Sequence, residues 1–127
     1  MAQRPVINEV TFHIGAVAER TALSLRTLRH YDEVGLLTPS GRTEGGFRLY
    51  TEADVQRLLL IRRMKPLGFS LEEMADLLDL TDSLAQDDTP EARARLAAYV
   101  TSAQERRADL ARKLAMADEF IDLLHRL

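Results

Sequence analysis

The side chains with the clearest chemistry in this sequence are cations in two neighbouring stretches. Residues 24–37 read SLRTLRHYDEVGLL, and residues 42–50 read RTEGGFRLY. In a helix over the first stretch, apolar residues recur at helical spacing and leave Arg26, Arg29 and His30 on the exposed side. Guanidinium groups bind phosphate or guanine through paired hydrogen bonds. The two stretches therefore predict a surface that meets a nucleic acid.

The second stretch predicts a basic hairpin, or wing. Its two adjacent glycines favour a tight turn, and the alternation after them favours a short strand. Arg48 and Tyr50 would share one face of this strand. Phe47 and Leu49 would share the other face. We expect residues 36–38 to form the partner strand, because the segment between the two strands is rich in turn formers.

The elements in front of the wing predict a helix-turn-helix. We expect a short strand at residues 11–13 and a helix from Ile14 to about Arg20. After a three-residue turn, the hydroxyl of Ser24 can cap the second helix by accepting from a first-turn amide. Gly35 suits the position after that helix, where the backbone is left-handed. The second helix of such a unit normally enters the major groove of DNA.

Two further helices are predicted after the wing. Their start and stop signals are a capping box at Thr51 and Asp54, a stop at Pro66 and Gly68, and a second capping box at Ser70 and Glu73. The fourth helix should run to about Leu80. Residues 81–89 are polar and acidic, and we expect them to form a linker.

The last predicted element is a long helix over residues 90–127, which starts with a Thr89 cap and a proline at its first position. Apolar residues recur in it at alternating spacings of three and four, which is the heptad register of a coiled coil. The seam, broken only by Arg107, consists of Val100, Ala103, Leu110, Leu114, Ala117, Ile121 and Leu124. A lone helix of this length has no core of its own, so we expect homodimerisation through it. The alternative is a helix that folds back on its own domain.

The composition excludes several classes of protein. A chain of 127 residues with 46% apolar content suits one modest domain plus an extended element, and it contains no run long enough to span a membrane. Residues 1–10 lack the apolar core of a signal peptide, so we expect a loose leader on an unexported, cytoplasmic chain. The absence of cysteine excludes disulfides, thiolate metal sites, iron–sulfur clusters and thiol redox sensing.

Charge is distributed unevenly along the chain. Residues 1–68 carry 10 Lys and Arg against 7 Asp and Glu, whereas residues 69–127 carry 7 against 13. The two parts therefore have net charges of +3 and −6, consistent with −3 for the whole chain. This asymmetry indicates that only the first part meets a polyanion, although scattered surface charge is the simpler explanation.

The segment from Ile14 to Leu78 resembles the winged helix-turn-helix domain of the mercury-resistance-regulator (MerR) type transcriptional regulators. LRHYDEVGLL, GFRLY and LGFSLEEM carry the resemblance by occurring together at these separations. The long helix after them is similar to the antiparallel dimerisation helix of that family. The implied fold is mainly α, with a winged helix-turn-helix DNA-binding domain over residues 11–80 and a coiled-coil dimerisation helix over residues 90–127.

The resemblance also implies which residues contact DNA: Arg26, Thr27, Arg29, His30 and Tyr31 on the recognition helix, Arg42, Arg48 and Tyr50 on the wing, and Lys65 at the end of the third helix. His30 stands where many relatives have a second tyrosine. Two members of this set have simpler explanations, because Tyr31 can be a core residue and Arg42 can be merely solvated.

By the same resemblance, the chain is expected to act as a homodimer on pseudo-palindromic promoter DNA. It would bend and untwist the spacer DNA for the RNA polymerase holoenzyme, at a cost of roughly 1–6 kcal/mol. The alternative is an architectural or adaptor protein that binds DNA without controlling a promoter. An enzyme is not expected, since the sequence has no nucleophile–base pair and no phosphate-binding glycine loop.

The sequence predicts no cofactor and leaves the signal open. Asp118, Asp122 and His125 share a helix face that has the donors of a hard or borderline metal site, but charges on the outside of a coiled coil are usually only solvated. A small apolar effector near Met116 and Phe120 is one alternative. Regulation by abundance, with no effector, is the other. Activation and repression are not distinguished.

Overall fold

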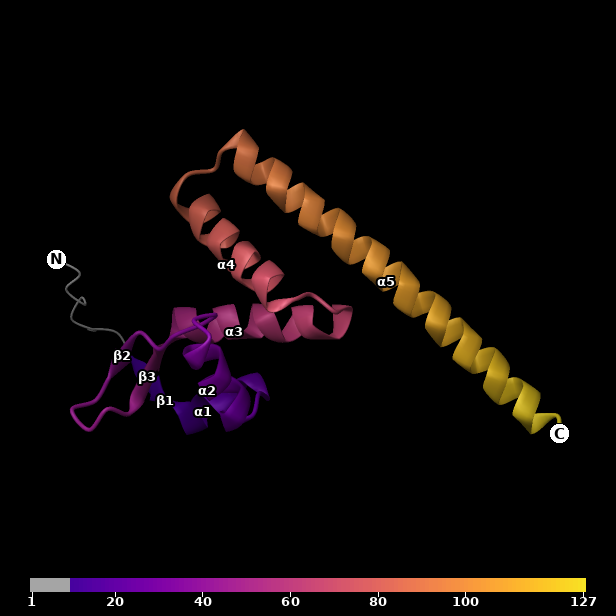
Figure 1. The fold of residues 1–127 in the computed structure, drawn as a ribbon, viewed down its shortest axis with the longest axis horizontal. Coiled ribbons are helices and arrows are strands. Elements are labelled where there is room, and N and C mark those ends of the chain that lie inside the picture. Colours follow the sequence, from indigo (N-terminus) through magenta and orange to yellow (C-terminus); the bar gives the residue numbers. More distant parts are fainter. Residues whose placement is uncertain (1–9) are drawn as a thin grey trace. The chain divides into compact units, whose positions relative to one another are not determined.

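The computed structural model describes residues 10–127 and divides the chain into two compact units, with the boundary between Ala75 and Asp76 (Figure 1). The predicted leader therefore lies outside the described residues, except for Val10. Among the described helices, none is long and apolar enough to cross a membrane.

The first unit combines short helices with a small sheet (Figure 1). Its elements are β1 (Thr11–His13), α1 (Ile14–Thr21), α2 (Leu25–Glu33), β2 (Gly41–Arg42), β3 (Arg48–Thr51), α3 (Glu52–Met64), the 3-10 helix η1 (Lys65–Leu67) and the start of α4 (Leu71–Gln86). The sheet is antiparallel, with β3 between β1 and β2. The predicted strand at residues 11–13 is confirmed.

The helix-turn-helix is also confirmed, and local hydrogen bonds explain its turn. The buried hydroxyl of Thr21 donates to the carbonyl of Val17 at 2.7 Å, which closes the end of α1. Ala22 then takes a left-handed conformation, with φ at 56°. Ser24 caps α2 by accepting from the amide of Thr27 at 3.0 Å. Gly35 follows α2 with φ at 75°, as its type predicts.

The first strand of the wing does not lie where the sequence predicted it. Residues 36–38 form no strand. Instead, the amides of Leu36 and Leu37 both donate to the carbonyl of Tyr31, at 2.9 and 3.2 Å, and both leucine side chains are buried. These residues therefore close the end of α2, and the chain pairs with β3 only at Gly41 and Arg42.

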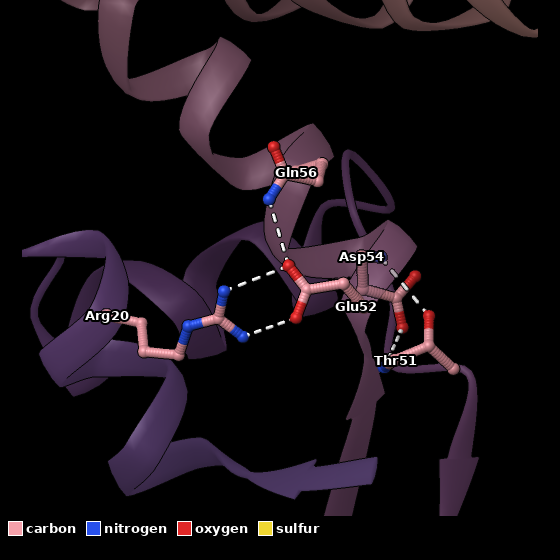
Figure 2. Close-up of polar contacts among 5 residues, drawn as sticks. All are labelled: Arg20, Thr51, Glu52, Asp54 and Gln56. Carbon is pink, nitrogen blue, oxygen red and sulfur yellow. Dashed lines mark hydrogen bonds and ion pairs between the residues drawn. The ribbon is translucent and has the colours of Figure 1, made fainter. Parts of the chain in front are cut away.

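The start of α3 holds the sheet and the wing to the helices. Thr51 and Asp54 form the predicted capping box, with both reciprocal hydrogen bonds present (Figure 2). Asp54 is buried, and its carboxylate also accepts from the hydroxyl of Ser40 at 2.6 Å. One side chain thus starts α3 and fixes the segment that leads into the wing.

A second contact at the start of α3 joins it to α1. Both terminal nitrogens of Arg20 donate to the carboxylate of Glu52, at 2.6 and 2.9 Å, and Gln56 donates to the same carboxylate (Figure 2). The hydrogen bond from Arg20, and to a smaller extent the one from Gln56, lowers the pKa of Glu52 from 4.5 to about 2. The guanidinium of Arg20 also lies 5.2 Å from the centre of the Phe12 ring. Arg20 therefore contacts both β1 and α3.

The second unit consists of the rest of α4 and the long helix α5 (Pro90–His125). The carboxylate of Asp76 on α4 accepts from Arg95 at 2.5 Å and from the hydroxyl of Tyr99 at 2.6 Å, which joins the two helices. Thr89 caps α5 as predicted, by accepting from the amide of Ala92.

The predicted end of α4 is wrong. The helix continues past Leu80 to Gln86, so only residues 87–89 separate it from α5. No glycine or proline occurs between Gly68 and Pro90, and the hydroxyl of Thr81 donates to the carbonyl of Leu78 within the helix. Polar residues alone therefore did not stop the helix.

Candidate nucleic-acid interface

The exposed side of α2 carries the predicted cations. Arg26, Arg29 and His30 are all exposed, and no hydrogen bond or ion pair within the described residues involves the side chains of the two arginines. Thr27 is half-buried, and its hydroxyl accepts from Ser24 at 2.9 Å. The helix therefore presents two free guanidinium groups and one imidazole, while Thr27 also takes part in the cap.

A cleft of about 760 Å³ lies beside this helix, within the first unit. Its lining includes the cations Arg26, Arg29 and Lys65, the imidazole of His30 and the acid Glu33, and the buried side chains of Phe69 and Met74 also line it. The Lys65 ammonium lies 5.9 Å from the centre of the Tyr31 ring. The structure thus brings six of the nine predicted contact residues together around one open hollow, where three cations outnumber one acid.

Two of the predicted contact residues belong to the core instead. The side chain of Tyr31 is 3% exposed, and that of Tyr50 is fully buried. Burial also raises the pKa of the Tyr50 phenol. In this conformation both rings are packed in the core, although Tyr31 also lines the cleft, and contact of either tyrosine with DNA stays a prediction. The simpler explanation of Tyr31 as a core residue is confirmed.

The burial of Tyr50 changes which apolar side chain the wing exposes. Phe47, expected on the apolar face of the strand, is 69% exposed at the end of the hairpin. Three hydrogen bonds close the turn beneath it: Gly46 N–H to the Thr43 carbonyl, Thr43 N–H to the Phe47 carbonyl and Phe47 N–H to the Thr43 hydroxyl. A side chain at Gly45 would meet the Phe47 ring at 3.2 Å, so glycine leaves space for the ring. The wing therefore holds an exposed aromatic ring on a closed turn.

The wing arginines are not free side chains, because both are paired with Asp32 near the end of α2. One oxygen of Asp32, Oδ2, accepts from Nε of Arg48 at 2.7 Å and from a terminal nitrogen of Arg42 at 2.9 Å. This pairing raises the pKa of Arg48. Arg42 also donates to the carbonyl of Gly46 at 3.1 Å, so the alternative of a merely solvated Arg42 is wrong.

Sequence reasoning missed both Asp32 and Phe47. Asp32 is distant from the wing in sequence and appeared as one of several acids on a helix. Phe47 follows the alternation of a strand, and alternation does not reveal which face of a strand is covered. An apolar residue directly after a turn glycine was the available signal for an exposed aromatic ring.

The second unit exposes the predicted apolar seam. Its large members Val100, Leu110, Leu114, Ile121 and Leu124 are all exposed on α5, whereas Ala103 is half-buried. Met116 and Phe120 are also exposed, so the described residues do not enclose a pocket around them. Asp118, Asp122 and His125 are exposed as well, and no group of three potential metal-binding side chains occurs within residues 10–127.

Comparison with known proteins identifies the family. Residues 12–81 match the family described as MerR HTH family regulatory protein, and residues 55–126 match the family described as MerR, DNA binding. Each match covers more than half of the chain. The chain belongs to the MerR family. This family consists of regulators rather than enzymes, which agrees with the sequence analysis.

Several curated regulators are similar to a little over half of this chain. The regulator ZntR of Escherichia coli is 45% identical over 69 residues, which are 54% of this chain and 49% of ZntR. The activator mta of Bacillus subtilis is 46% identical over 68 residues, which are 54% of this chain and 26% of mta. The chain thus spans between a quarter and a half of the length of these relatives.

Solved structures of MerR regulators extend the similarity to α5. HiNmlR, described as a MerR family regulator lacking the sensor domain and bound to promoter DNA, is 31% identical, with a TM-score of 0.71 and 92% of each chain covered. MtaN, the N-terminal part of the Bacillus subtilis multidrug transporter activator, is 35% identical, with a TM-score of 0.57 and coverage of 91% of this chain and 95% of MtaN. The predicted fold class, a winged helix-turn-helix followed by a long helix, is confirmed.

Proposed function

We propose that the chain is a sequence-specific transcriptional regulator that binds promoter DNA as a homodimer. The cleft beside α2 carries this proposal, since Arg26, Arg29 and Lys65 surround it without an ion partner among the described residues. Cations gathered on one helix and at the end of another suit the phosphates that border a DNA groove. As a DNA-binding regulator, the protein would work in the cytoplasm.

Each element of the first unit has a distinct role in this proposal. Helix α2 lies in the major groove, where Arg26, Arg29 and His30 contact phosphates and base edges. Lys65 contacts a phosphate at the rim of the cleft. The wing contacts the neighbouring backbone through Arg48 and through the exposed ring of Phe47. Tyr31 and Tyr50 support these elements from the core.

The homodimer is proposed from the surface of α5. A helix that exposes Leu110, Leu114 and Ile121 in heptad register leaves a long apolar stripe in water. Burial of this stripe against a second copy in antiparallel orientation would remove the stripe from solvent. It would also place two DNA-binding units on one pseudo-palindromic site. HiNmlR, a protein of similar fold, is bound to promoter DNA in its structure, which supports the DNA-binding part of this proposal.

With two units on one duplex, we further propose that the dimer bends and untwists the DNA between its half-sites. Such deformation costs roughly 1–6 kcal/mol, which phosphate contacts from two basic units offset. RNA polymerase holoenzyme would then read the altered promoter. A small apolar molecule that binds near Met116 and Phe120 would act by changing the geometry of the dimer.

The test is binding to a duplex that the wild-type protein selects from a random pool. Fluorescence anisotropy should show tight binding to the selected duplex, weaker binding to a scrambled duplex, and affinity that falls steeply with salt. Arg29→Ala should weaken binding and reduce the salt slope by about 0.9 for each lost phosphate contact, hence by about 1.8 for a dimer that carries it in both copies. Lys113→Ala on α5 is the control for loss of one charge. Equal binding to both duplexes would contradict the proposal and favour the architectural or adaptor alternative.

A further inference from the structure

One half-buried carboxylate joins the two elements that meet DNA in the proposed function. Asp32 near the end of α2 is only 12% exposed in its side chain. Its Oδ2 atom accepts from Arg48 on β3 at 2.7 Å and from Arg42 on β2 at 2.9 Å. We call these three residues the Asp32 cluster. It connects the recognition helix to both strands of the wing.

The sheet register explains why the wing needs this acid. Arg42 and Arg48 are directly opposite each other on neighbouring antiparallel strands. Like charges at such positions repel and destabilise the pairing of the strands. Because one oxygen of Asp32 contacts both guanidinium groups, the acid offsets this repulsion where β2 and β3 meet.

The cluster also fixes the direction of each arginine. Asp32 accepts from Nε of Arg48, and no hydrogen bond within the described residues uses the two Nη groups of that arginine. One edge of the guanidinium is therefore held, while the other nitrogens remain available for a phosphate. Arg42 donates one nitrogen to Asp32 and another to the carbonyl of Gly46 in the turn. Hence the turn that carries Phe47 is connected to α2 through Arg42.

From this geometry we infer that Asp32 is a positioning residue for DNA recognition. Although its negative charge repels phosphates, it sets the wing at a fixed place relative to α2, so that both elements fit one site. This inference rests on the proposed function. Without Asp32, two cations on a less constrained wing would still attract any DNA, but they would fit a specific site less well. The acid therefore contributes to specificity more than to affinity.

The test compares Asp32→Asn with Glu33→Gln in the full chain. Each substitution removes one negative charge and keeps the shape of the side chain. Glu33 lines the same cleft and its charge also acts on Arg48, but it is exposed and makes no hydrogen bond or ion pair within the described residues, so it is a control for charge alone. Anisotropy on the selected and scrambled duplexes gives a specificity ratio for each variant. For Asp32→Asn we expect at least a tenfold fall in this ratio, with equal or tighter binding to the scrambled duplex. For Glu33→Gln the ratio should stay within twofold of wild type.

Hydrogen–deuterium exchange of the wing amides provides a readout that is independent of DNA. Asp32→Asn should increase exchange at residues 41–48, whereas Glu33→Gln should not. Asp32→Glu keeps the charge on a longer arm, so it should recover part of the specificity ratio. It also serves as the test if the asparagine variant does not fold.

Two results would overturn the inference. One is a specificity ratio for Asp32→Asn that stays within twofold of wild type. The other is an equal fall of the specificity ratio in Asp32→Asn and Glu33→Gln, which would assign the effect to charge alone. Failure of the proposed function is a distinct outcome, because the wild-type protein itself would then bind the selected and scrambled duplexes equally.

Discussion

Individual cations in the first unit differ in what their nitrogens already bind. Arg20, Arg42 and Arg48 have carboxylate partners within 3 Å, whereas Arg26 and Arg29 have none among the described residues. An unpaired exposed arginine can bind a phosphate without breaking an internal contact. Among the arginines predicted to contact DNA, the unpaired ones lie on α2, so the strongest DNA contacts are expected from that helix, with the wing in support.

His30 is expected to read bases. It stands on the exposed side of α2 directly after Arg29, and an imidazole ring offers two nitrogens for hydrogen bonds to a base edge. We predict that His30→Ala reduces the free-energy preference for one base over the others at the contacted position by about 1–3 kcal/mol. The affinity for a scrambled duplex should stay within twofold of wild type. A second round of selection with the variant would measure this. Equal losses on selected and scrambled duplexes would show a phosphate contact instead.

Phe47 is expected to add an uncharged contact at the wing. Phe47→Ala should weaken binding to the selected duplex severalfold, by about 1 kcal/mol, because an aromatic ring would no longer meet the sugar or base surface. The salt slope should not change, since no charge is removed. Phe47→Leu, which keeps apolar bulk, is the matched control and should bind more tightly than the alanine variant. A changed slope in Phe47→Ala would indicate that the wing itself had been disturbed.

At this scale the sequence predicted residue types better than residue environments. It identified Arg26, Arg29 and His30 as exposed because helical spacing places apolar residues on the other side. It did not predict the burial of Tyr50, because two opposite faces of a strand look alike until the neighbouring elements are known. Asp32 could not be predicted as a partner of the wing, since its contacts join residues ten and sixteen positions apart.

Among the secondary-structure elements, α3 is where the helices and the sheet are joined. Its first turn contains the Thr51–Asp54 capping box and the contact of Glu52 with Arg20 (Figure 2). Its buried face includes Val55, Leu58 and Ile61. Changes at the start of α3 are therefore expected to affect stability more than DNA contacts.

Loss of the cap should destabilise the chain. We predict that Thr51→Ala lowers the free energy of unfolding by about 1–2 kcal/mol, because the amide of Asp54 loses its acceptor at a buried position. Urea unfolding followed by circular dichroism measures this difference. Thr38→Ala, at an exposed threonine outside any helix, should change stability by less than about 0.5 kcal/mol. Equal effects of the two substitutions would contradict the role of the cap.

The contact of Glu52 with Arg20 predicts a pH dependence. The pKa of Glu52 is lowered from 4.5 to about 2 in the folded protein, so the folded state holds its proton less tightly than the unfolded state. The stabilisation is therefore present above about pH 4.5 and is lost as the pH falls toward 2. Its size is small because the pair is exposed.

Glu52→Gln removes this titration. The variant should lose less stability than wild type between pH 5 and pH 3, when urea midpoints are compared across that range. Glu44→Gln, at an exposed glutamate of the wing without an ion pair in the described structure, should follow the wild-type curve. Parallel curves for Glu52→Gln and wild type would show that the ion pair contributes nothing measurable.

Elements with local signals were predictable, and those set by distant pairing were not. The caps at Ser24, Thr51 and Thr89 depend on residues within one turn, and all three form as predicted. The first wing strand was misplaced because its position depends on pairing with β3 and on the hydrogen bond from Ser40 to Asp54. The end of α4 was misplaced because polar residues were given the weight of a true helix stop.

For the molecule as a whole, the chain carries two separate functions along its length. The first unit binds DNA in our proposal, and α5 provides the exposed seam for a second copy. The net charge is +3 in residues 1–68, but it is +1 over the whole first unit, residues 1–75, and −4 over residues 76–127. Two basic units would approach the duplex, while the acidic part would be repelled by it.

The seam gives a direct prediction for assembly. Leu114→Asp would place a charge in the apolar interface of each copy, so the dissociation constant of the dimer should rise at least about a hundredfold. Sedimentation equilibrium measures this change. Ala115→Asp adds the same charge on the neighbouring, exposed position outside the seam and should leave the dimer intact. If both variants dimerise like wild type, α5 does not form the interface.

The most direct measurement of the central claim is hydroxyl-radical footprinting of the wild-type protein on its selected duplex. A homodimer that uses α2 and the wing should protect two equivalent patches, related by two-fold symmetry on the two strands and separated by a whole number of turns of about 10 base pairs. Asp32→Asn should lose protection at the outer, wing-contacted edge of each patch first. A single unsymmetrical patch, or uniform weak protection along the duplex, would contradict a dimeric, sequence-specific regulator.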